Sequence, residues 1–358
     1  IHLYTGHLVR VLWAGTASNY FCAVNGVKQG GVVSPILFCI YIDELLIGLS
    51  EFGYGCYIGV NFVGALAYAD DIVLICPTAT AMRKLLIVCD SFAHNLNILF
   101  NAQKSKFIVI AAGNRHHLID IMRKCVFYVG GNCIENVNSF VHLGHIITDR
   151  LGDSDDILYR RNCFIGQANN VLCYFNKLDT FVKLNLFKAY CSSLYGCELW
   201  NLEDSGIDDF CVAWRKALRR VLDLPYNSHS FLLPLLSDTL PIYDEICKRS
   251  ARFTMSCLFS NSSLVRSIAW YGIDVGRQNS CVGRNALFCC NRFNWSVSDF
   301  LCGNVILHNS FFSDLSRSKI TNTEKCTALS LMEAICIRKG AFELPLLSSS
   351  EVGAIISL

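Results

Sequence analysis

Two adjacent aspartates, Asp70 and Asp71, constrain the fold more than any other feature of the sequence, because apolar residues flank them on both sides. Residues 64–69 and 72–76 are short apolar runs, and Pro77 follows the second run. This pattern predicts two strands joined by a tight turn, with the acids at its tip. Neighbouring carboxylates repel one another, and each resists ionisation. Two explanations stay open at this point: a solvated turn, in which Asp is a common residue, or a site where divalent cations neutralise the pair.

A helix is predicted to begin at Ser34 and Pro35. Ser is a preferred N-cap residue, and Pro suits the first helical position, where its missing N–H has no partner to lose. The apolar residues that keep helical spacing after it, and that should face a core, are Ile36, Leu37, Ile40, Tyr41, Leu45 and Leu49. Thr80 is expected to cap the next helix, whose apolar stripe runs from Met82 to Leu96.

The sequence pattern changes from strand-like to helical along the chain. Residues 107–112 predict a strand and residues 127–134 a hairpin, whereas helical spacing dominates from about Ile157 onward. The acids expected in the loop and at the N-cap before the first of these later helices are Asp153, Asp155 and Asp156.

Twenty cysteines are scattered through the chain without any CxxC pair, which disfavours a zinc ribbon or a thioredoxin-type motif. Most lie in apolar runs, among them Cys39, Cys76, Cys89 and Cys191, where a reduced thiol behaves as a small hydrophobe. We therefore expect an intracellular, reducing location, in the nucleus, the cytoplasm or both. Residues 52–69 carry no charge, but glycines interrupt them, so strands and turns are expected there and no membrane span.

Six segments carry, in order, a resemblance to one protein family: residues 27–38, 68–71, 101–106, 140–146, 190–200 and 213–220. They resemble the reverse transcriptase of a LINE-type (non-LTR) retrotransposon, near the jockey-like group. Residues 140–146 are similar to the primer-grip segment of that family, and the last two segments to the region that follows its palm. The aspartate pair alone favours a plain solvated turn, but the first four of these segments, in order and at family spacing, favour the metal-binding explanation instead.

The resemblance implies an α+β fold: a polymerase palm, with an antiparallel sheet and packed helices, followed by an α-helical thumb and a C-terminal helical region. The corresponding domains are residues 1–150 for a partial palm, 151–260 for a thumb-like region and 261–358 for the C-terminal region. The implied activity is RNA-directed DNA synthesis by two-metal nucleotidyl transfer, with two Mg²⁺ ions, deoxynucleoside triphosphates, an RNA template and a DNA primer. The sequence indicates no oligomeric state.

The resemblance also assigns roles to individual residues. Asp70 and Asp71 would hold the metal. Lys104 would lie near the triphosphate, as charge stabiliser or general acid, and Lys106 is the second candidate for that role. A surface lysine remains the alternative for both. The residues that would contact nucleotide, template or primer are Gln29, Gly30, Gly31, Tyr68, Ala69, Leu143 and Gly144. For Leu143 and Gly144, a plain core turn remains the alternative.

A helix is predicted over about residues 208–224, with Phe210, Trp214, Leu218 and Leu222 recurring every four residues. The basic residues on its opposite face are Arg215, Lys216, Arg219 and Arg220. This face would follow the phosphates of a template–primer duplex, or it is a solvated charged face; both interpretations stay open.

The family carries a further metal-binding Asp before its glycine motif, yet none of the first 28 residues here is acidic. We therefore expect the chain to be the rear portion of a longer polymerase, lacking the fingers, and not to polymerise by itself, because a two-metal site needs its carboxylates together. The alternative function is a non-catalytic nucleic-acid-binding or inert retrotransposon remnant.

Overall fold

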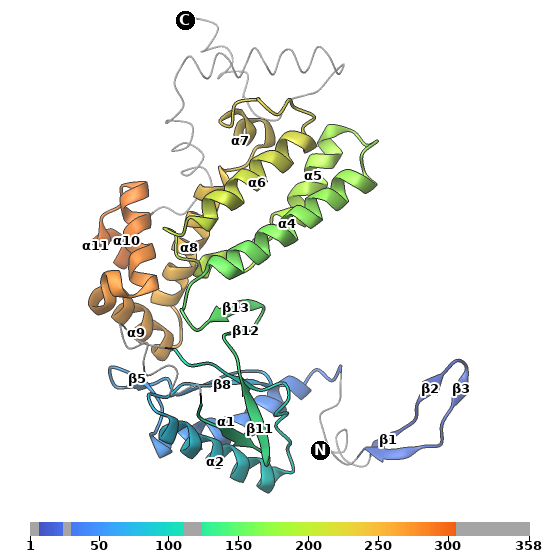
Figure 1. Ribbon diagram of the computed structural model, residues 1–358, viewed down its shortest axis with the longest axis vertical. Coiled ribbons are helices and arrows are strands. Elements are labelled where there is room, and N and C mark those ends of the chain that lie inside the picture. The colour runs from blue at the N-terminus through green and yellow to red at the C-terminus, as the bar shows by residue number, and fades with distance from the viewer. Residues whose placement is uncertain (1–6, 24–29, 111–123, 306–358) are drawn as a thin grey trace, which may run out of the picture. The chain divides into compact units, whose positions relative to one another are not determined.

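The computed structural model describes residues 7–23, 30–110 and 124–305 (Figure 1). The chain forms two compact units. The first comprises Ile1–Val109 and Gly113–Val137, and the second Ile110–Ala112 and Asn138–Leu358. Helices and small, mostly antiparallel sheets are mixed along the chain, which is the α+β composition that the sequence predicted.

The first unit opens with paired strands and continues with two long helices around a hairpin. Strand β1 (His7–Val9) pairs with β4 (Phe21–Ala23), and β2 (Leu12–Trp13) pairs with β3 (Thr16–Ala17). The following elements are α1 (Ser34–Phe52), β5 (Tyr57–Ile58), β6 (Asn61–Phe62), β7 (Ala65–Tyr68), β8 (Asp71–Leu74), α2 (Ala79–Leu96), β9 (Lys106–Phe107), β10 (Phe127–Val129) and β11 (Asn132–Asn136). The predicted hairpin through Asp70 and Asp71 is confirmed as the antiparallel pair β7–β8.

Helix α1 begins where the sequence predicted, but it packs on a different face. Ser34 is its first residue, so Val33 occupies the N-cap. Leu45 and Leu49 are buried as predicted and lie with Ile42 in a cluster with α2 residues. The prediction was wrong for three residues that are exposed: Ile36, Ile40 and Tyr41. The face in contact with α2 and β7 is set by those neighbours, which helical spacing alone does not identify.

Helix α2 has the apolar stripe that was predicted, with Leu85, Cys89 and Phe92 buried against α1. Its cap was predicted wrongly. Thr78 is the N-cap, and its hydroxyl accepts a hydrogen bond from the Ala81 amide at 3.1 Å, while Thr80 lies inside the helix. Thr78 has the extended backbone typical of an N-cap, with φ −143° and ψ 153°, whereas Thr80 already has helical partners.

Residues 52–69 form the end of α1, the β5–β6 hairpin and most of β7. Gly55 and Gly64 allow their backbones to approach closely, since a Cβ on Gly55 would lie 2.4 Å from the Gly64 Cα. Within the described ranges, no helix combines the length and the hydropathy that a bilayer crossing requires.

The second unit starts with a hairpin and is otherwise helical. Strand β12 (Ser139–His142) pairs with β13 (His145–Thr148). The helices are α4 (Ser154–Tyr174), α5 (Thr180–Cys191), the 3₁₀ turn η1 (Cys197–Leu199), α6 (Gly206–Val221), α7 (Leu232–Ser237), α8 (Ile242–Leu258), α9 (Ser263–Tyr271), the π-helical η2 (Gly272–Gly276), the 3₁₀ turn η3 (Arg277–Asn279), α10 (Cys281–Phe293) and α11 (Val297–Leu301). The β12–β13 hairpin therefore groups with the helices, although the sequence placed it within residues 1–150.

Helix α6 lies at the centre of the second unit and packs against α4, α5, α7 and α8 (Figure 1). The predicted apolar stripe is confirmed, because Phe210, Trp214, Leu218 and Leu222 are all buried. The assignment of these regions as palm, thumb and C-terminal domains stays a prediction.

Every cysteine in the described ranges is a free thiol. Cys89 and Cys191 are buried, and burial raises the pKa of the first to about 12 and of the second to about 11. They behave as the small hydrophobes that the sequence suggested. Cys39 departs from this expectation and is exposed on α1, on the side away from the core.

Candidate functional site

The Asp70–Asp71 turn presents two carboxylates to solvent. Tyr68 pairs with Asp71 across the hairpin, so Ala69 and Asp70 form a two-residue turn, and Ala69 takes the left-handed backbone with φ +52°. Both aspartates and Tyr68 are exposed. Neither carboxylate makes a hydrogen bond or ion pair with the described part of the chain, so their oxygens are free to bind a cation.

The glycines that the resemblance assigns to this site lie in a different part of the chain, before α1. Gly30 has φ +77° and open space around it, and the Gly31 carbonyl accepts a hydrogen bond from the Ser34 amide at 3.1 Å. These two glycines thus form the turn that leads into α1. Gln29 lies outside the described residues.

The two candidate lysines differ in their contacts. Lys106, in β9, forms an ion pair with Glu135 at 2.5 Å. Lys104 is exposed in the preceding turn, where its backbone amide donates to the Asn101 carbonyl and side-chain oxygens at 3.2 and 3.1 Å. Its ammonium group forms no ion pair with the described residues. Lys104 is therefore the cation of the two that has no ion-pair partner among the described residues, and its role near a triphosphate stays a prediction.

Leu143 and Gly144 form the two-residue turn between β12 and β13. Both have positive φ, +48° and +78° respectively, which is the pattern of a type I′ turn. Gly suits that backbone, whereas Leu is rarely found in it. The Leu143 side chain is 39% exposed. The turn is thus a surface feature with an unusual backbone, not a plain turn in the core.

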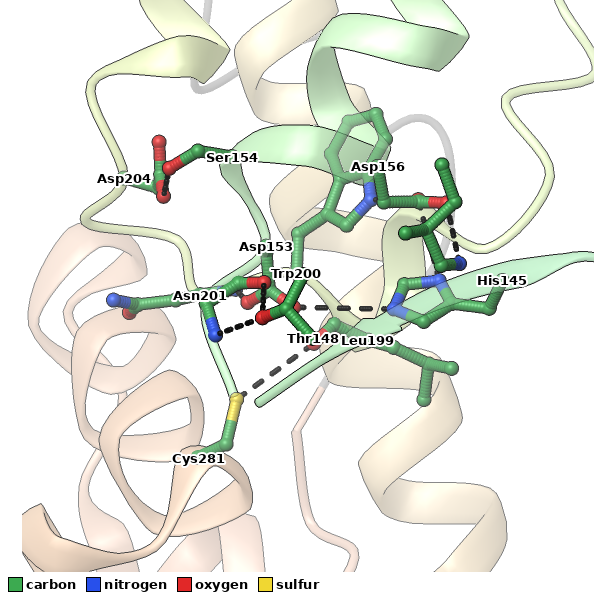
Figure 2. A network of polar contacts seen from close by, with 12 residues as sticks. His145, Thr148, Asp153, Ser154, Asp156, Leu199, Trp200, Asn201, Asp204 and Cys281 are labelled. Carbon is green, nitrogen blue, oxygen red and sulfur yellow. Dashed lines mark hydrogen bonds and ion pairs between the residues drawn. The ribbon is translucent and has the colours of Figure 1, made fainter. Parts of the chain in front are cut away.

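A polar network joins this hairpin to the helices, and the buried carboxylate of Asp156 lies at its centre (Figure 2). It accepts hydrogen bonds from the Ile146 amide at 3.1 Å and from the Trp200 indole at 2.8 Å. Burial opposes ionisation of Asp156, but contacts with His145, Trp200 and Ile146 outweigh this and lower its pKa. From the sequence, Asp156 was expected among the loop and N-cap acids before the helix. That assignment was wrong, because the residue lies in the first turn of α4 and faces inward.

His145 lies between two carboxylates (Figure 2). Its Nδ1 is 3.2 Å from Asp156 Oδ2, and its Nε2 is 3.9 Å from Asp153 Oδ1. Asp153 and Asp156 together raise the pKa of His145 to about 9, so the imidazole is protonated at neutral pH. Gly196 leaves room for the ring, since a Cβ there would lie 3.3 Å from Nδ1.

The segment that ends at Trp200 is fixed by buried polar contacts. The Trp200 carbonyl accepts a hydrogen bond from the Asn285 side chain at 2.8 Å, and Asn285 Oδ1 accepts from the Leu202 amide at 3.1 Å. The Asp153 carboxylate accepts a hydrogen bond from the backbone N–H of Asn201 at 2.7 Å. The segments at 140–146 and 190–200, which resemble one family separately, are therefore parts of one structure. The sequence pattern did not single out His145, Asp156 or Trp200 as partners.

The basic residues of α6 lie on its solvent-facing side, but two of them have structural partners. Arg219 donates two hydrogen bonds to the Ser228 carbonyl at 3.0 and 2.8 Å, and Arg220 donates to Asn169 of α4 at 2.8 Å. Lys216 is exposed and Arg215 half-buried, and neither is hydrogen-bonded to the described residues. In these same ranges no three His, Cys, Asp or Glu side chains gather into a possible metal site.

Comparison with known proteins relates the first part of the chain to one family. Residues 3–147 match the family described as "Reverse transcriptase (RNA-dependent DNA polymerase)". The Retrovirus-related Pol polyprotein from type-1 retrotransposable element R2 of Popillia japonica is 31% identical over 141 residues, which is 38% of this chain and 18% of that protein. The corresponding polyprotein from type-2 element R2DM of Drosophila melanogaster is 35% identical over 123 residues, 34% of this chain and 11% of that protein.

A third relative extends beyond the family match. The "Probable RNA-directed DNA polymerase from transposon X-element" of Drosophila melanogaster is 23% identical over 240 residues, which cover 64% of this chain and 25% of that protein. The chain spans a quarter or less of the length of these three relatives.

The raised pKa of His145 makes the stability of the second unit depend on pH. The folded state holds the proton more tightly than the unfolded state, so the stabilisation is complete below about pH 6.5 and is lost as the pH rises through about 9. We expect the free energy of unfolding to fall by up to ~3 kcal/mol across this interval. A His145→Gln variant should show a much shallower decline in denaturant unfolding followed by tryptophan fluorescence. Equal declines in the free energy of unfolding of both proteins would contradict the claim that protonated His145 stabilises the fold.

Proposed function

We propose that this chain, whose residues 3–147 match the reverse transcriptase family and which is similar to non-LTR retrotransposon polyproteins, takes part in RNA-directed DNA synthesis by two-metal nucleotidyl transfer. The observation that carries the proposal is the exposed Asp70–Asp71 turn, whose carboxylates have no partner among the described residues. The substrates proposed are deoxynucleoside triphosphates on an RNA template with a DNA primer. We further propose that the chain works in the nucleus or the cytoplasm, where its thiols stay reduced.

Asp70 and Asp71 would hold divalent cations, for which we propose Mg²⁺, because its preferred ligands are carboxylate and phosphate oxygens. A bound cation supplies Lewis-acid stabilisation of phosphate oxygens and of the attacking hydroxyl. Lys104 would add positive charge near the triphosphate, or donate the proton to the leaving pyrophosphate.

The resemblance also gives several uncharged residues proposed roles. Gln29, Gly30 and Gly31 would face the incoming nucleotide and template. Tyr68 would pack beside the primer terminus, while Ala69 keeps the turn tight. Leu143 and Gly144 would support the primer strand by shape.

The basic face of α6 supplies a proposed phosphate-binding surface. Among its four cations, Lys216 and Arg215 are the ones without hydrogen bonds inside the described structure, so we propose that they make the principal phosphate contacts. Arg219 and Arg220 would contribute mainly through the field of the helix face, since their guanidinium groups already bind Ser228 and Asn169.

The metal-binding role predicts a specific loss. We expect the double variant Asp70→Asn, Asp71→Asn to bind a Mn²⁺–dGTP complex at least about tenfold more weakly than the wild-type chain, because two anionic oxygen ligands are replaced by neutral amides. Electron paramagnetic resonance of Mn²⁺ measures this affinity. Asp43→Asn, an exposed acid on α1, is the matched control and should bind as the wild type. Unchanged affinity in the double variant, or no affinity in the wild type, would refute the role.

We also expect the purified chain to extend a primed RNA template no faster than its Asp70→Asn variant in the presence of Mg²⁺. Both proposed ligands come from one turn, whereas two-metal transfer requires carboxylates brought together from more than one segment. A primer-extension gel provides the measurement. Robust primer extension by the wild-type chain would contradict the expectation that this chain cannot polymerise by itself. If Asp70→Asn abolishes that extension, the result would support the role of Asp70.

The phosphate surface predicts a change in salt dependence. Lys216→Ala should reduce the slope of log K against log salt by about 0.9 for a template–primer duplex, the value for one lost phosphate contact. Arg220→Ala should leave the slope nearly unchanged. Fluorescence anisotropy with a labelled duplex at several salt concentrations tests both, and equal slopes for wild type and Lys216→Ala would exclude Lys216 as a phosphate contact.

A further inference from the structure

The Leu143–Gly144 turn has a backbone that its sequence does not favour. Type I′ turns need positive φ at both central residues, and Asn–Gly satisfies this readily. Here a leucine occupies the first position, with φ +48°. An L residue with a branched apolar side chain keeps such a backbone only where the surrounding structure holds it.

Two side chains from distant segments hold this turn. The Tyr195 hydroxyl donates a hydrogen bond to the Leu143 carbonyl at 2.7 Å, although the two residues are 52 positions apart. The Arg160 guanidinium, on α4, donates to the Gly144 carbonyl. Both carbonyls of the turn are therefore bound from the helical part of the same unit.

The two donors also support each other. The Arg160 guanidinium lies over the Tyr195 ring, 5.0 Å from its centroid, in a cation–π contact. A Cβ on Gly144 would lie only 3.2 Å from the Tyr195 ring, so the turn and the ring are in close contact. The next residues along β13 are fixed as well, since His145 and the Ile146 amide contact Asp156.

The turn nevertheless remains at the surface. Tyr195 is 56% exposed and Leu143 39% exposed, so the contacts hold the backbone while leaving the leucine side chain accessible. An Asn–Gly turn would form without this support, but it would present a polar side chain. The support is needed only because an apolar side chain stands at the first position.

We infer that Tyr195 and Arg160 are positioning residues that hold Leu143 in its left-handed backbone, so that its apolar side chain is presented to the primer strand of a bound nucleic acid. This inference rests on the proposed role of Leu143 and Gly144 in supporting the primer. It adds two residues, from the 190–200 segment and from α4, to the machinery of that site.

A double-mutant cycle tests whether Tyr195 holds the turn. Tyr195→Phe removes only the hydroxyl, and Leu143→Asn removes the need for support. In the Leu143 background, Tyr195→Phe should accelerate hydrogen exchange of the backbone amides of residues 143–146 by roughly tenfold, as expected for a lost hydrogen bond. In the Leu143→Asn background the same change should have an effect of less than about twofold. Equal effects in both backgrounds would show that Tyr195 merely stabilises the unit, and would overturn the inference.

The affinity for an RNA template–DNA primer duplex tests whether positioning matters for binding. Tyr195→Phe and Leu143→Asn should each weaken binding several-fold in fluorescence anisotropy. Tyr159→Phe is the matched control: its ring lies 5.5 Å from the same Arg160 guanidinium, its hydroxyl makes no hydrogen bond to the described residues, and binding should be unchanged.

The outcomes of the two experiments separate the claims. Coupling in the exchange cycle together with wild-type affinity in Tyr195→Phe would overturn the positioning role. If the wild-type chain does not bind the duplex, the proposed function fails, and with it the presentation of Leu143 to nucleic acid. The exchange cycle still decides in that case whether Tyr195 holds the turn.

Discussion

The hydrogen-bonded carboxylate of Asp156 is the interaction on which the organisation of the second unit depends. A carboxylate without solvent contact is unfavourable unless donors surround it. The Ile146 amide on β13 and the Trp200 indole after η1 donate hydrogen bonds to it. Two basic side chains form ion pairs with it: His145 on β13, whose Nδ1 is 3.2 Å away, and Arg160 on α4, whose Nε is 3.8 Å away. Displacing β13 or the segment that carries Trp200 would remove part of the compensation for this buried charge. The network therefore fixes the β12–β13 hairpin against the helices.

Two surface turns of the chain differ in character. The Asp70–Asp71 turn belongs to a hairpin packed against α1, and its carboxylates form no hydrogen bond or ion pair with the residues that the structure describes. The Leu143–Gly144 turn is bound through both of its carbonyls. Free carboxylates suit a site that takes up cations and nucleotides. A rigid apolar turn suits a surface that holds a nucleic-acid strand in one position.

Local patterns in the sequence predicted the elements well, and long-range contacts account for what they missed. The hairpin at Asp70 and the buried stripe of α6 follow from residue spacing alone. Asp156 was missed because its partners Ile146 and Trp200 lie 10 and 44 positions away, and its own neighbours resemble ordinary N-cap acids. The exposed face of α1 was assigned wrongly at Ile36 and Ile40 for a related reason. Helical spacing locates an apolar stripe, but the packing partners decide which part of it is buried.

The most direct test of this account is hydrogen exchange at the backbone amides of residues 143–146 in Asp156→Asn, with Asp155→Asn as the control. Both residues lie in the first turn of α4, so their effects on the helix terminus are matched, but Asp155 is exposed. The account predicts that Asp156→Asn accelerates exchange in the turn by about tenfold or more, because His145 and Arg160 lose their anionic partner. Asp155→Asn should leave exchange unchanged. Equal exchange in the two variants would contradict the claim that the Asp156 carboxylate holds the hairpin in place.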